Sequence, residues 1–549
     1  MSKFYTNIEV RGNNILYRGY EDGLPVQRKI EYRPHLFVKT AEETKYKVFK
    51  SGIPVKKRVF DSISDMKQFT EQYKDVPNFN IYGCSNIVRQ FTGAMFPVEI
   101  VWDYTQTKIW FFDIETRVDR LLVDAKTEVV IRHRSAPEIE KKVIAYSLLN
   151  LHTDWEVLGK NGKWGTSNAS GFVAAGFPNV EYAREEVLMV SLYDRFNKKL
   201  HLWSLIKASD SNPIFENFKD VNFQYFEDEK QLLKSFIFFF ADNRVDILSG
   251  WNSELFDVPF IVNRIKNVLG ETALPFLSPW RSVKQRTIRN DDGSTDIAYD
   301  ISGVVHLDYM VAYKKFNPGS KESFKLDFIA ELELGEKKVE VPGESFREGY
   351  ILYPEIFVEY SAVDTMLLNK MEDKLLQVRL AMQLAYLARC QITDVLSSMR
   401  LWESIIYNYF LDINLVEDWN KPRNEKHKIV GAYVHEPVPG KYGWTVSVDA
   451  TSKYPSIMMQ NNLSPETIVD FFDHVTMDGM LHEKHSSEVP EGCILSCNGL
   501  VTRTDVQGFI PILVKRFFDL RSQLKKQMLE KKKELETVRN ELKSLGVSV

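Results

Sequence analysis

The stretch KIWFFDIET, residues 108–116, has the pattern of a buried strand that ends in two acidic residues. Side chains alternate across a strand, so Asp113 and Glu115 point to one side and Ile114 packs on the other. Two neighbouring carboxylates repel each other unless a positive group lies between them. A pair of divalent cations about 3.5–4 Å apart, holding both oxygens of a reacting phosphodiester, would supply that charge. A lone D-x-E is also typical of a strand end with two solvated acids, so the motif needs partners.

The composition indicates a globular, multidomain protein. A chain of 549 residues is too long for one hydrophobic core, and we expect three or four domains. No long uncharged apolar run and no signal-peptide pattern occur, which predicts a soluble cytoplasmic protein without membrane contact. The four cysteines are too few for a disulfide framework. A net charge of −4 does not indicate a nucleic-acid binder. Local basic strips can nevertheless bind DNA in a protein whose catalytic acids make the net charge negative.

Turn signals and strand-like runs outline the first half of the chain. Residues 1–107 alternate such runs with turns and predict a small α+β domain. Residues 186–193 and 199–205 predict a hairpin that extends the sheet begun at Lys108. Residues 283–301 predict a second hairpin around the turn DDGS. That hairpin could help to separate a primer end from its template, and a plain surface hairpin fits the pattern equally well.

A third acid lies in the stretch ILSGWNSELFDVPF, residues 247–260, which predicts a short strand, a loop and a helix. Asp257 is placed at the start of the helix, where the macrodipole favours a negative group and an ordinary cap is the simplest reading. Asn252 and Phe256 in the loop suggest a nucleotide holder. The amide would be a hydrogen-bond partner, and the ring would be a wedge against a base.

A fourth acid belongs to the helical pattern VEYSAVDTMLL, residues 358–368. Tyr360 and Asp364 are four positions apart, so they share a helix face and can enter one cleft together. A helical tyrosine and aspartate would normally be an exposed pair. The ordered set D-x-E, N-x-x-x-F-D and Y-x-x-x-D arises by chance far less often than any one of its members.

Two further motifs lie near the end of the chain. The run WTVSVDATSKYPSIM, residues 444–458, predicts a strand that delivers Asp449 to a site where a carboxylate can hold metal beside a triphosphate. A strand-end aspartate before a turn is also ordinary. The segment GFIP, residues 508–511, predicts the start of a long helix on which Arg521 and Lys525 share a face suited to phosphates. A charged helix face is the alternative, and residues 526–543 favour a solvated helix or a helical partner surface.

Taken in order, these motifs resemble the family B DNA polymerases with a DEDDy-type 3′-5′ proofreading exonuclease. The replicative polymerases of large tailed bacteriophages are the most similar, and the resemblance covers most of the chain. It implies that two Mg²⁺ or Mn²⁺ ions are held by Asp113, Glu115, Asp257 and Asp364. It also implies that Tyr360 helps to orient the attacking water.

The run around Asp449 resembles polymerase motif A, D-x-x-S-L-Y-P-S-I. The resemblance implies that Asp449 and the Ala450 carbonyl hold metal, and that Tyr454 excludes a 2′-hydroxyl by its bulk. The nucleotide-binding residues it implies are Ser452, Lys453, Tyr454, Arg521 and Lys525. Lys453 stands where the family has leucine, which preserves an amide contact but changes the packing beneath it. Gly431 and Tyr433 resemble the Y-x-G-G/A element that handles the DNA strand between the two sites, although the leading tyrosine is absent.

The same resemblance implies a mixed α/β and α+β multidomain fold. The N-terminal α+β domain would comprise residues 1–107 and 377–420. A ribonuclease H-like exonuclease domain would occupy residues 108–376. An incomplete polymerase palm would occupy residues 421–506, and the first part of the helical fingers would follow at residues 507–549.

The family's next fingers helix and its palm D-T-D-S strand are absent from this sequence. One polymerase acid cannot hold two metals. We therefore expect this chain to be one part of a split DNA polymerase that also proofreads. A second chain would supply the remaining palm, fingers and thumb, and would contact the sliding clamp. The substrates would be primer–template DNA, its single-stranded 3′ end and deoxynucleoside triphosphates. The alternatives are a free-standing DEDDy exonuclease and a non-enzymatic nucleic-acid-binding regulator.

Overall fold

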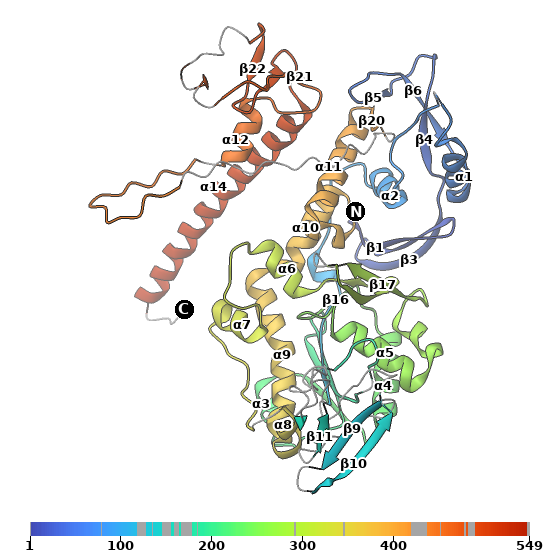
Figure 1. Cartoon of the computed structure of the whole chain (residues 1–549), viewed down its shortest axis with the longest axis vertical. Coiled ribbons are helices and arrows are strands. Elements are labelled where there is room, and N and C mark those ends of the chain that lie inside the picture. The colour runs from blue at the N-terminus through green and yellow to red at the C-terminus, as the bar shows by residue number, and fades with distance from the viewer. Residues whose placement is uncertain are drawn as a thin grey trace. The chain divides into compact units, whose positions relative to one another are not determined.

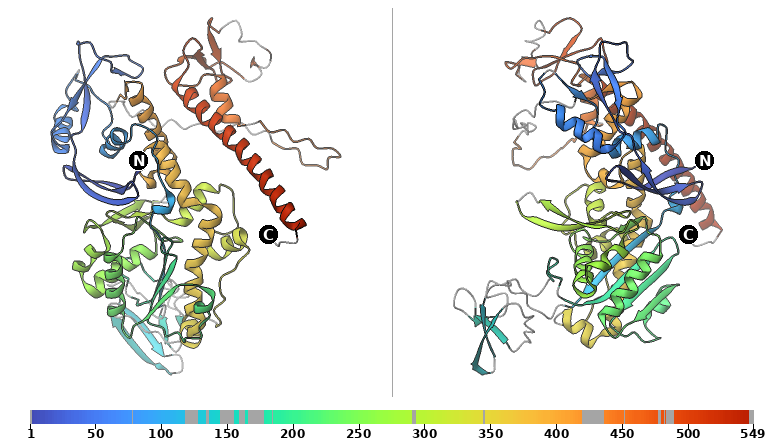
Figure 2. Two further views of the ribbon diagram at one scale, coloured as in Figure 1. Left: turned by 180° about the vertical axis from the view of Figure 1, so that it is seen from behind. Right: turned by 90° about the vertical axis from the view of Figure 1, so that its right-hand side faces the viewer.

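The structure is a computed structural model of the chain (Figure 1, Figure 2). It describes residues 2–77, 79–117, 128–133, 136–144, 155–158, 164–165, 178–183, 185–289, 293–343, 346–418, 436–450, 452–476, 479–480, 482 and 489–545. The chain divides into two units, residues 1–49 with 53–421 and residues 50–52 with 422–549. Within the described ranges, no helix combines the length and the apolar character needed to cross a membrane.

The N-terminal part of the first unit contains two small sheets. The first is the antiparallel meander β1 (Lys3–Arg11), β2 (Asn14–Glu21) and β3 (Leu24–Glu31). The second has the order β6-β4-β7, formed by β6 (Val55–Val59), β4 (His35–Lys39) and β7 (Ile81–Tyr82). The short strand β5 (Lys47–Val48) pairs in parallel with β20 (Leu415–Val416), and two helices accompany the sheets, α1 (Ile63–Tyr73) and α2 (Ile87–Met95). The predicted α+β character of this region is confirmed.

Residues late in the first unit return to this N-terminal part. They form α10 (Gln377–Ala388), the 3-10 helix η3 (Ile392–Leu396) and α11 (Ser398–Asp412). The Tyr386 hydroxyl donates to the Tyr5 carbonyl at 2.7 Å, and the Tyr5 hydroxyl donates to the Cys390 carbonyl at 2.5 Å. These buried bonds join segments far apart in the sequence into one hydrophobic core.

The second part of the first unit is built on a six-stranded sheet of order β15-β14-β13-β8-β16-β19. Its strands are β8 (Ile109–Thr116), β13 (Val187–Asp194), β14 (Lys199–Ser204), β15 (Val221–Tyr225), β16 (Ile247–Ser249) and β19 (Val305–His306). The strand β13 runs antiparallel to both neighbours, and the other pairs are parallel. The predicted hairpin that extends the sheet from β8 is therefore confirmed.

The two faces of this sheet are covered by different helices. Trp110, Phe112 and Ile114 of β8 lie in a core with side chains of α4 (Glu229–Asp242) and α5 (Asp257–Leu269). The opposite face packs against α9 (Pro354–Leu375), on which Phe357 and Val358 contact the core of β13 and β14. The alternation of β8 therefore aims its two acids at the side of the sheet that α9 covers.

The remaining elements of the first unit surround this sheet. They are η1 (Tyr104–Gln106), α3 (Pro213–Asn217), η2 (Glu271–Leu277), α6 (Tyr309–Phe316), α7 (Leu326–Leu334) and α8 (Phe346–Leu352). The strands β17 (Val283–Arg289) and β18 (Thr295–Ile301) form the predicted second hairpin. A separate sheet of order β10-β9-β11-β12 contains β9 (Glu128–His133), β10 (Ala136–Ile144), β11 (Trp155–Leu158) and β12 (Trp164–Gly165).

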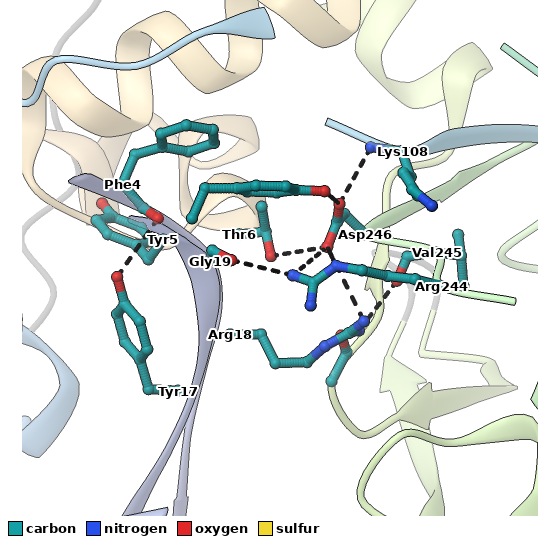
Figure 3. Close-up of polar contacts among 12 residues, drawn as sticks. Phe4, Tyr5, Thr6, Tyr17, Arg18, Gly19, Lys108, Arg244, Val245 and Asp246 are labelled. Atoms are coloured by element: carbon teal, nitrogen blue, oxygen red, sulfur yellow. Dashed lines mark hydrogen bonds and ion pairs between the residues drawn. The ribbon is translucent and has the colours of Figure 1, made fainter. Parts of the chain in front are cut away.

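Asp246, immediately before β16, joins the first N-terminal sheet to the six-stranded sheet (Figure 3). Its carboxylate is fully buried and accepts hydrogen bonds from the Tyr20 hydroxyl at 2.6 Å and from the Lys108 amide at 3.0 Å. It also accepts from the Thr6 hydroxyl at 3.1 Å and pairs with Arg244 at 2.9 Å. The buried Asp246 carboxylate, with its hydrogen bonds and its ion pair, thus holds the start of β8 against β1 and β2.

The described part of the second unit includes a three-stranded sheet and the helices α12 (Lys453–Gln460) and α14 (Phe509–Ser544). The sheet has the order β21-β23-β22, from β21 (Ile468–Phe471), β23 (Leu500–Arg503) and β22 (Cys493–Leu495). Helix α12 and the predicted long helix α14 pack together.

The strand predicted before Asp449 is not present. Residues 436–450 contain neither helix nor strand, and the alternating side chains Trp444 and Val448 are 97% and 89% exposed. A strand needs a neighbour that accepts its hydrogen bonds and covers its apolar face. No described residue pairs with this run, so the pattern for a strand is there but the strand does not form.

Candidate active site

Three carboxylates converge where β8 meets α9. Asp113 and Glu115 come from the strand and Asp364 comes from the helix, and one oxygen of each lies within 4.8 Å of the others. The two strand residues share a face because they are two positions apart. The helix contributes Asp364 because it packs across β8 and β13. Glu115 and Asp364 are buried, at 8% and 3% exposure.

Asp257 lies beside this group without belonging to it. It is the first residue of α5, and its Oδ1 accepts a hydrogen bond from the Ile114 amide at 3.1 Å. It is buried and close enough to Asp113 for the two charges to repel each other. The predicted position of Asp257 at a helix start is therefore confirmed, and the backbone of β8 holds its carboxylate next to the other acids.

Burial raises the pKa values of all these acids, and repulsion within the cluster adds to the shift of Asp113, Glu115 and Asp257. Burial and the nearby Asp364 together raise the pKa of Asp113 to about 7, although Lys338 opposes the shift. Burial and then Asp113 raise the pKa of Glu115 well above its usual value. Burial and Asp113 likewise raise the pKa of Asp257, while burial raises the pKa of Asp364 against the effect of Lys338. The site therefore stabilises added positive charge, either as protons or as a cation.

Lys338 already supplies one positive charge. It lies between α7 and α8, and its ammonium group forms an ion pair with the Asp364 carboxylate. The same nitrogen donates to the Tyr360 hydroxyl at 3.4 Å and lies 5.1 Å from the centre of the Tyr360 ring. Burial lowers the pKa of Lys338, but the neighbouring Asp364 more than reverses this, so its pKa is raised.

The sequence motifs did not reveal Lys338. It belongs to the polar run ELGEKKVEVPG, residues 333–343, where no helical or strand period sets it apart from neighbouring lysines. Tyr360, which the motifs did indicate, lies beside Asp364 on α9, and burial followed by the charge of Glu115 raises its pKa. The two residues expected to share a helix face do so in one buried cluster.

The donor set fits a divalent cation. Oxygens of Asp113, Glu115 and Asp364 converge, and hard oxygen ligands are the ones that Mg²⁺ and Mn²⁺ prefer. The Asp364 Oδ1 atom is buried and has no hydrogen-bond partner among the described residues. A buried carboxylate oxygen without a partner is costly, and a bound cation would satisfy it.

The loop between β16 and α5 carries Asn252 and Phe256. Asn252 has φ +62°, and its carbonyl accepts from the Leu255 and Phe256 amides, which forms the tight turn before α5. The Phe256 ring packs 5.8 Å from the Phe260 ring and is half-buried. These residues lie on the loop that delivers Asp257, as the motif predicts.

The candidate polymerase residues that the structure describes lie in the second unit, and all of them except the half-buried Ser452 are solvent-exposed. Asp449 and Ala450 are exposed, and Tyr454 at the start of α12 is 73% exposed. Ser452 has φ +49° and caps α12, and Lys453 is its first residue. Arg521 and Lys525 lie on the exposed surface of α14. Gly431 and Tyr433 fall outside the described residues.

No second metal-binding group accompanies Asp449. Within the described ranges, the group of Asp113, Glu115 and Asp364 is the one set of at least three histidine, cysteine, aspartate or glutamate side chains with converging ligand atoms. The structure therefore brings together three of the acids that the motifs indicate, and Asp449 belongs to no such group among the described residues.

Comparison with known proteins gives two family matches and several relatives. Residues 163–329 match "DNA polymerase family B, exonuclease domain", and residues 383–543 match "DNA polymerase family B". The DNA-directed DNA polymerase of Escherichia phage RB69 is 26% identical over 577 residues, covering 100% of this chain and 56% of the phage protein. That of Enterobacteria phage T4 is 29% identical over 550 residues, covering 98% and 55%. The DNA polymerase of Pyrococcus glycovorans is 25% identical, covering 65% and 42%. The chain spans about half the length of the phage relatives.

Proposed function

The chain belongs to the family B DNA polymerases, and from this premise we propose that its first unit is a 3′-5′ exonuclease that proofreads a DNA primer. The proposed exonuclease domain comprises residues 108–376 and has a ribonuclease H-like sheet. The N-terminal domain comprises residues 1–107 and 377–420. The substrate of the proposed exonuclease is the single-stranded 3′ end of DNA, in the cytoplasm of a bacterial host.

The observation that carries this proposal is the convergence of Asp113, Glu115 and Asp364 beside Asp257. These residues would hold two divalent cations, Mg²⁺ as the sequence predicts, with Mn²⁺ as the alternative. The chemistry that such a pair supplies is an activated water and a compensated charge on the leaving 3′-oxygen.

The chain's own residues position the reactants. Tyr360 presents its hydroxyl beside Asp364, where it can orient a water by hydrogen bonding, and its raised pKa keeps it protonated as a donor. Lys338 fixes both side chains through its ion pair with Asp364 and its contact with the Tyr360 ring. Asn252 and Phe256, on the loop before Asp257, would hold the terminal nucleotide by hydrogen bonding and stacking.

The test is excision of a single-stranded oligonucleotide by the purified chain with Mg²⁺. Asp113→Asn keeps the shape of the side chain and removes its charge, and it should reduce excision by at least about a hundredfold. Mutation of residues that only hydrogen-bond to metal ligands already lowers metal affinity or activity about ten- to hundredfold. Asp373→Asn is the matched control, since Asp373 is a 59% exposed acid on the same helix as Asp364. Equal excision by the wild type and Asp113→Asn would refute the proposal.

We propose further that Asp449 belongs to a polymerase centre. Residues other than those that the structure describes would complete that centre. The support is physical. Among the described residues, Asp449 belongs to no group of three or more converging metal-ligand side chains, and the apolar side chains before it are exposed, as in a strand that lacks a neighbour. Residues 421–506 would be palm and residues 507–549 fingers, with Ser452, Lys453, Tyr454, Arg521 and Lys525 around the nucleotide and Gly431 with Tyr433 along the DNA.

In the split-polymerase hypothesis, a separate chain supplies the remaining palm, fingers and thumb and contacts the sliding clamp. Primer extension with deoxynucleoside triphosphates should then appear when the purified chain is mixed with that partner, and should require Asp449. Extension by the chain alone would contradict the hypothesis. The alternative of a free-standing exonuclease is favoured by the complete acidic cluster within one unit, and strong excision without any partner would support it.

A further inference from the structure

The strand β13 carries one small polar side chain within an apolar, buried run. Residues 187–193 read VLMVSLY, and Ser191 is 0% exposed. Val190 and Leu192 lie in the core on the α4 and α5 side of the sheet, whereas Met189 lies in the core on the α9 side. Because side chains alternate along a strand, Ser191 faces α9 as Met189 does. A hydrophobic side chain would need no hydrogen bond at this position, so the buried hydroxyl requires an explanation.

Ser191 is the cross-strand neighbour of Asp113. The two residues lie directly opposite each other where β13 pairs antiparallel with β8, so their side chains point to the same face of the sheet. The Cβ atoms of such neighbours are typically about 4.5–5.5 Å apart, which allows a hydrogen bond between a hydroxyl and a carboxylate. Glu115 has no comparable neighbour on β13, because Met189 lies opposite it.

The Ser191 hydroxyl has no hydrogen-bond partner among the described residues. A buried donor without an acceptor is costly, and native structures contain few of them. The hydroxyl oxygen is attached to Cβ, so rotation about χ1 can turn it toward Asp113 without any movement of the backbone. The chain therefore places an unused donor next to one of the three converging acids.

We propose that Ser191 is a positioning residue of the exonuclease, and that its hydroxyl donates to the Asp113 carboxylate when this acid holds a divalent cation. The inference rests on the exonuclease function proposed above. A carboxylate has two oxygens, so one can bind a cation while the other accepts a hydrogen bond. Such a bond fixes the orientation of the acid, and metal ligands are commonly held by partners of this kind.

Two simpler explanations give Ser191 no part in the reaction. In the first, a buried water away from the acids satisfies the hydroxyl, as such waters do for many isolated polar groups. In the second, only the small size of the side chain matters, because α9 packs closely across β13. Alanine is equally small and has no hydroxyl. Both simpler explanations therefore predict that Ser191→Ala leaves metal binding unchanged, whereas the proposal predicts a loss.

The test is calorimetric titration of the metal-free full chain with Mn²⁺, in the absence of DNA. Ser191→Ala should raise the Mn²⁺ concentration for half-saturation by about tenfold, the lower end of the range for residues that orient metal ligands. Ser191→Thr keeps a hydroxyl and should restore binding toward the wild-type value. The control is Thr107→Val, which removes another buried hydroxyl without a partner and keeps the shape of the side chain. Thr107 precedes the start of β8, away from the acids, so this variant should bind Mn²⁺ like the wild type.

Excision of a single-stranded oligonucleotide gives a second readout. At limiting Mg²⁺, Ser191→Ala should lower kcat by about tenfold, and the difference from the wild type should shrink as Mg²⁺ is raised. The KM for the oligonucleotide should not change, because Asn252 and Phe256 are unaltered. The melting temperature of the metal-free chain should stay the same or rise in Ser191→Ala, since the variant no longer buries an unpaired donor. A merely structural role would instead lower the melting temperature.

Two results would overturn the proposal. The first is equal Mn²⁺ half-saturation in the wild type and in Ser191→Ala. The second is equal weakening of Mn²⁺ binding in Ser191→Ala and Thr107→Val, which would indicate a general effect of altered packing. Failure of the exonuclease proposal is recognised separately, because Asp113→Asn would then excise as well as the wild type. If only the role of Ser191 is wrong, Asp113→Asn loses excision while Ser191→Ala keeps it in full.

Discussion

Metal binding by the acidic cluster should weaken as the pH falls, because protons and cations compete for the same carboxylates. The relevant group is Asp113, whose pKa burial raises to about 7, with a contribution from Asp364. An ordinary aspartate would be fully ionised between pH 6 and pH 8. The sign follows from the direction of the shift. An acid with a raised pKa keeps its proton at lower pH, so the cation must displace that proton.

The magnitude follows from the pKa of Asp113. With a pKa of about 7, the ionised fraction falls from roughly ten-elevenths at pH 8 to roughly one-eleventh at pH 6. The Mn²⁺ concentration for half-saturation should therefore rise about tenfold between pH 8 and pH 6. Because the pKa values of Glu115, Asp257 and Asp364 are also raised, tenfold is the lower limit.

The assay is calorimetric titration of the metal-free chain with Mn²⁺ at the two pH values, in the absence of DNA. Asp113→Asn should bind Mn²⁺ weakly and should lose much of the pH dependence, whereas the exposed-acid control Asp373→Asn should behave like the wild type. The reasoning would be refuted by equal half-saturation at both pH values, or by full pH dependence in Asp113→Asn. Without metal, the same shift predicts that the stabilisation from Asp113 is present below about pH 4 and is lost as the pH rises through about 7.

Three further predictions concern single side chains. Lys338→Met should slow excision at saturating Mg²⁺ by at least about tenfold in single-turnover measurements, because the cation that positions Asp364 and Tyr360 is lost. Asp246→Ala should destabilise the first unit by about 3–5 kcal/mol in urea unfolding, because Arg244 would lose the buried carboxylate with which it pairs. The control is Asp242→Ala, since Asp242 is exposed. Phe112→Ala should cost about 3–5 kcal/mol in the same measurement, because the fully buried ring stacks on Phe236.

Several elements of this fold could be predicted from local pattern alone. The apolar run that ends in Asp113 and Glu115 forms β8, the helix predicted at Asp257 begins there, and β17 pairs with β18 as the predicted hairpin. These predictions succeed because periodicity, caps and turn residues act over a few positions of the chain. The run at residues 444–449 fails for the same reason. Its alternation is local, whereas a strand also requires a neighbouring backbone.

The sequence by itself determined which acidic residues are candidates, in which order they occur and which face of each element they occupy. Only the tertiary structure decided that α9 packs across β8, so that Asp364 comes within 4.8 Å of Asp113 and Glu115. It also decided that Lys338, unmarked in the sequence, is the cation beside them. The physical reason is that burial and charge compensation depend on which side chains share a space, and long-range packing rather than local periodicity determines this.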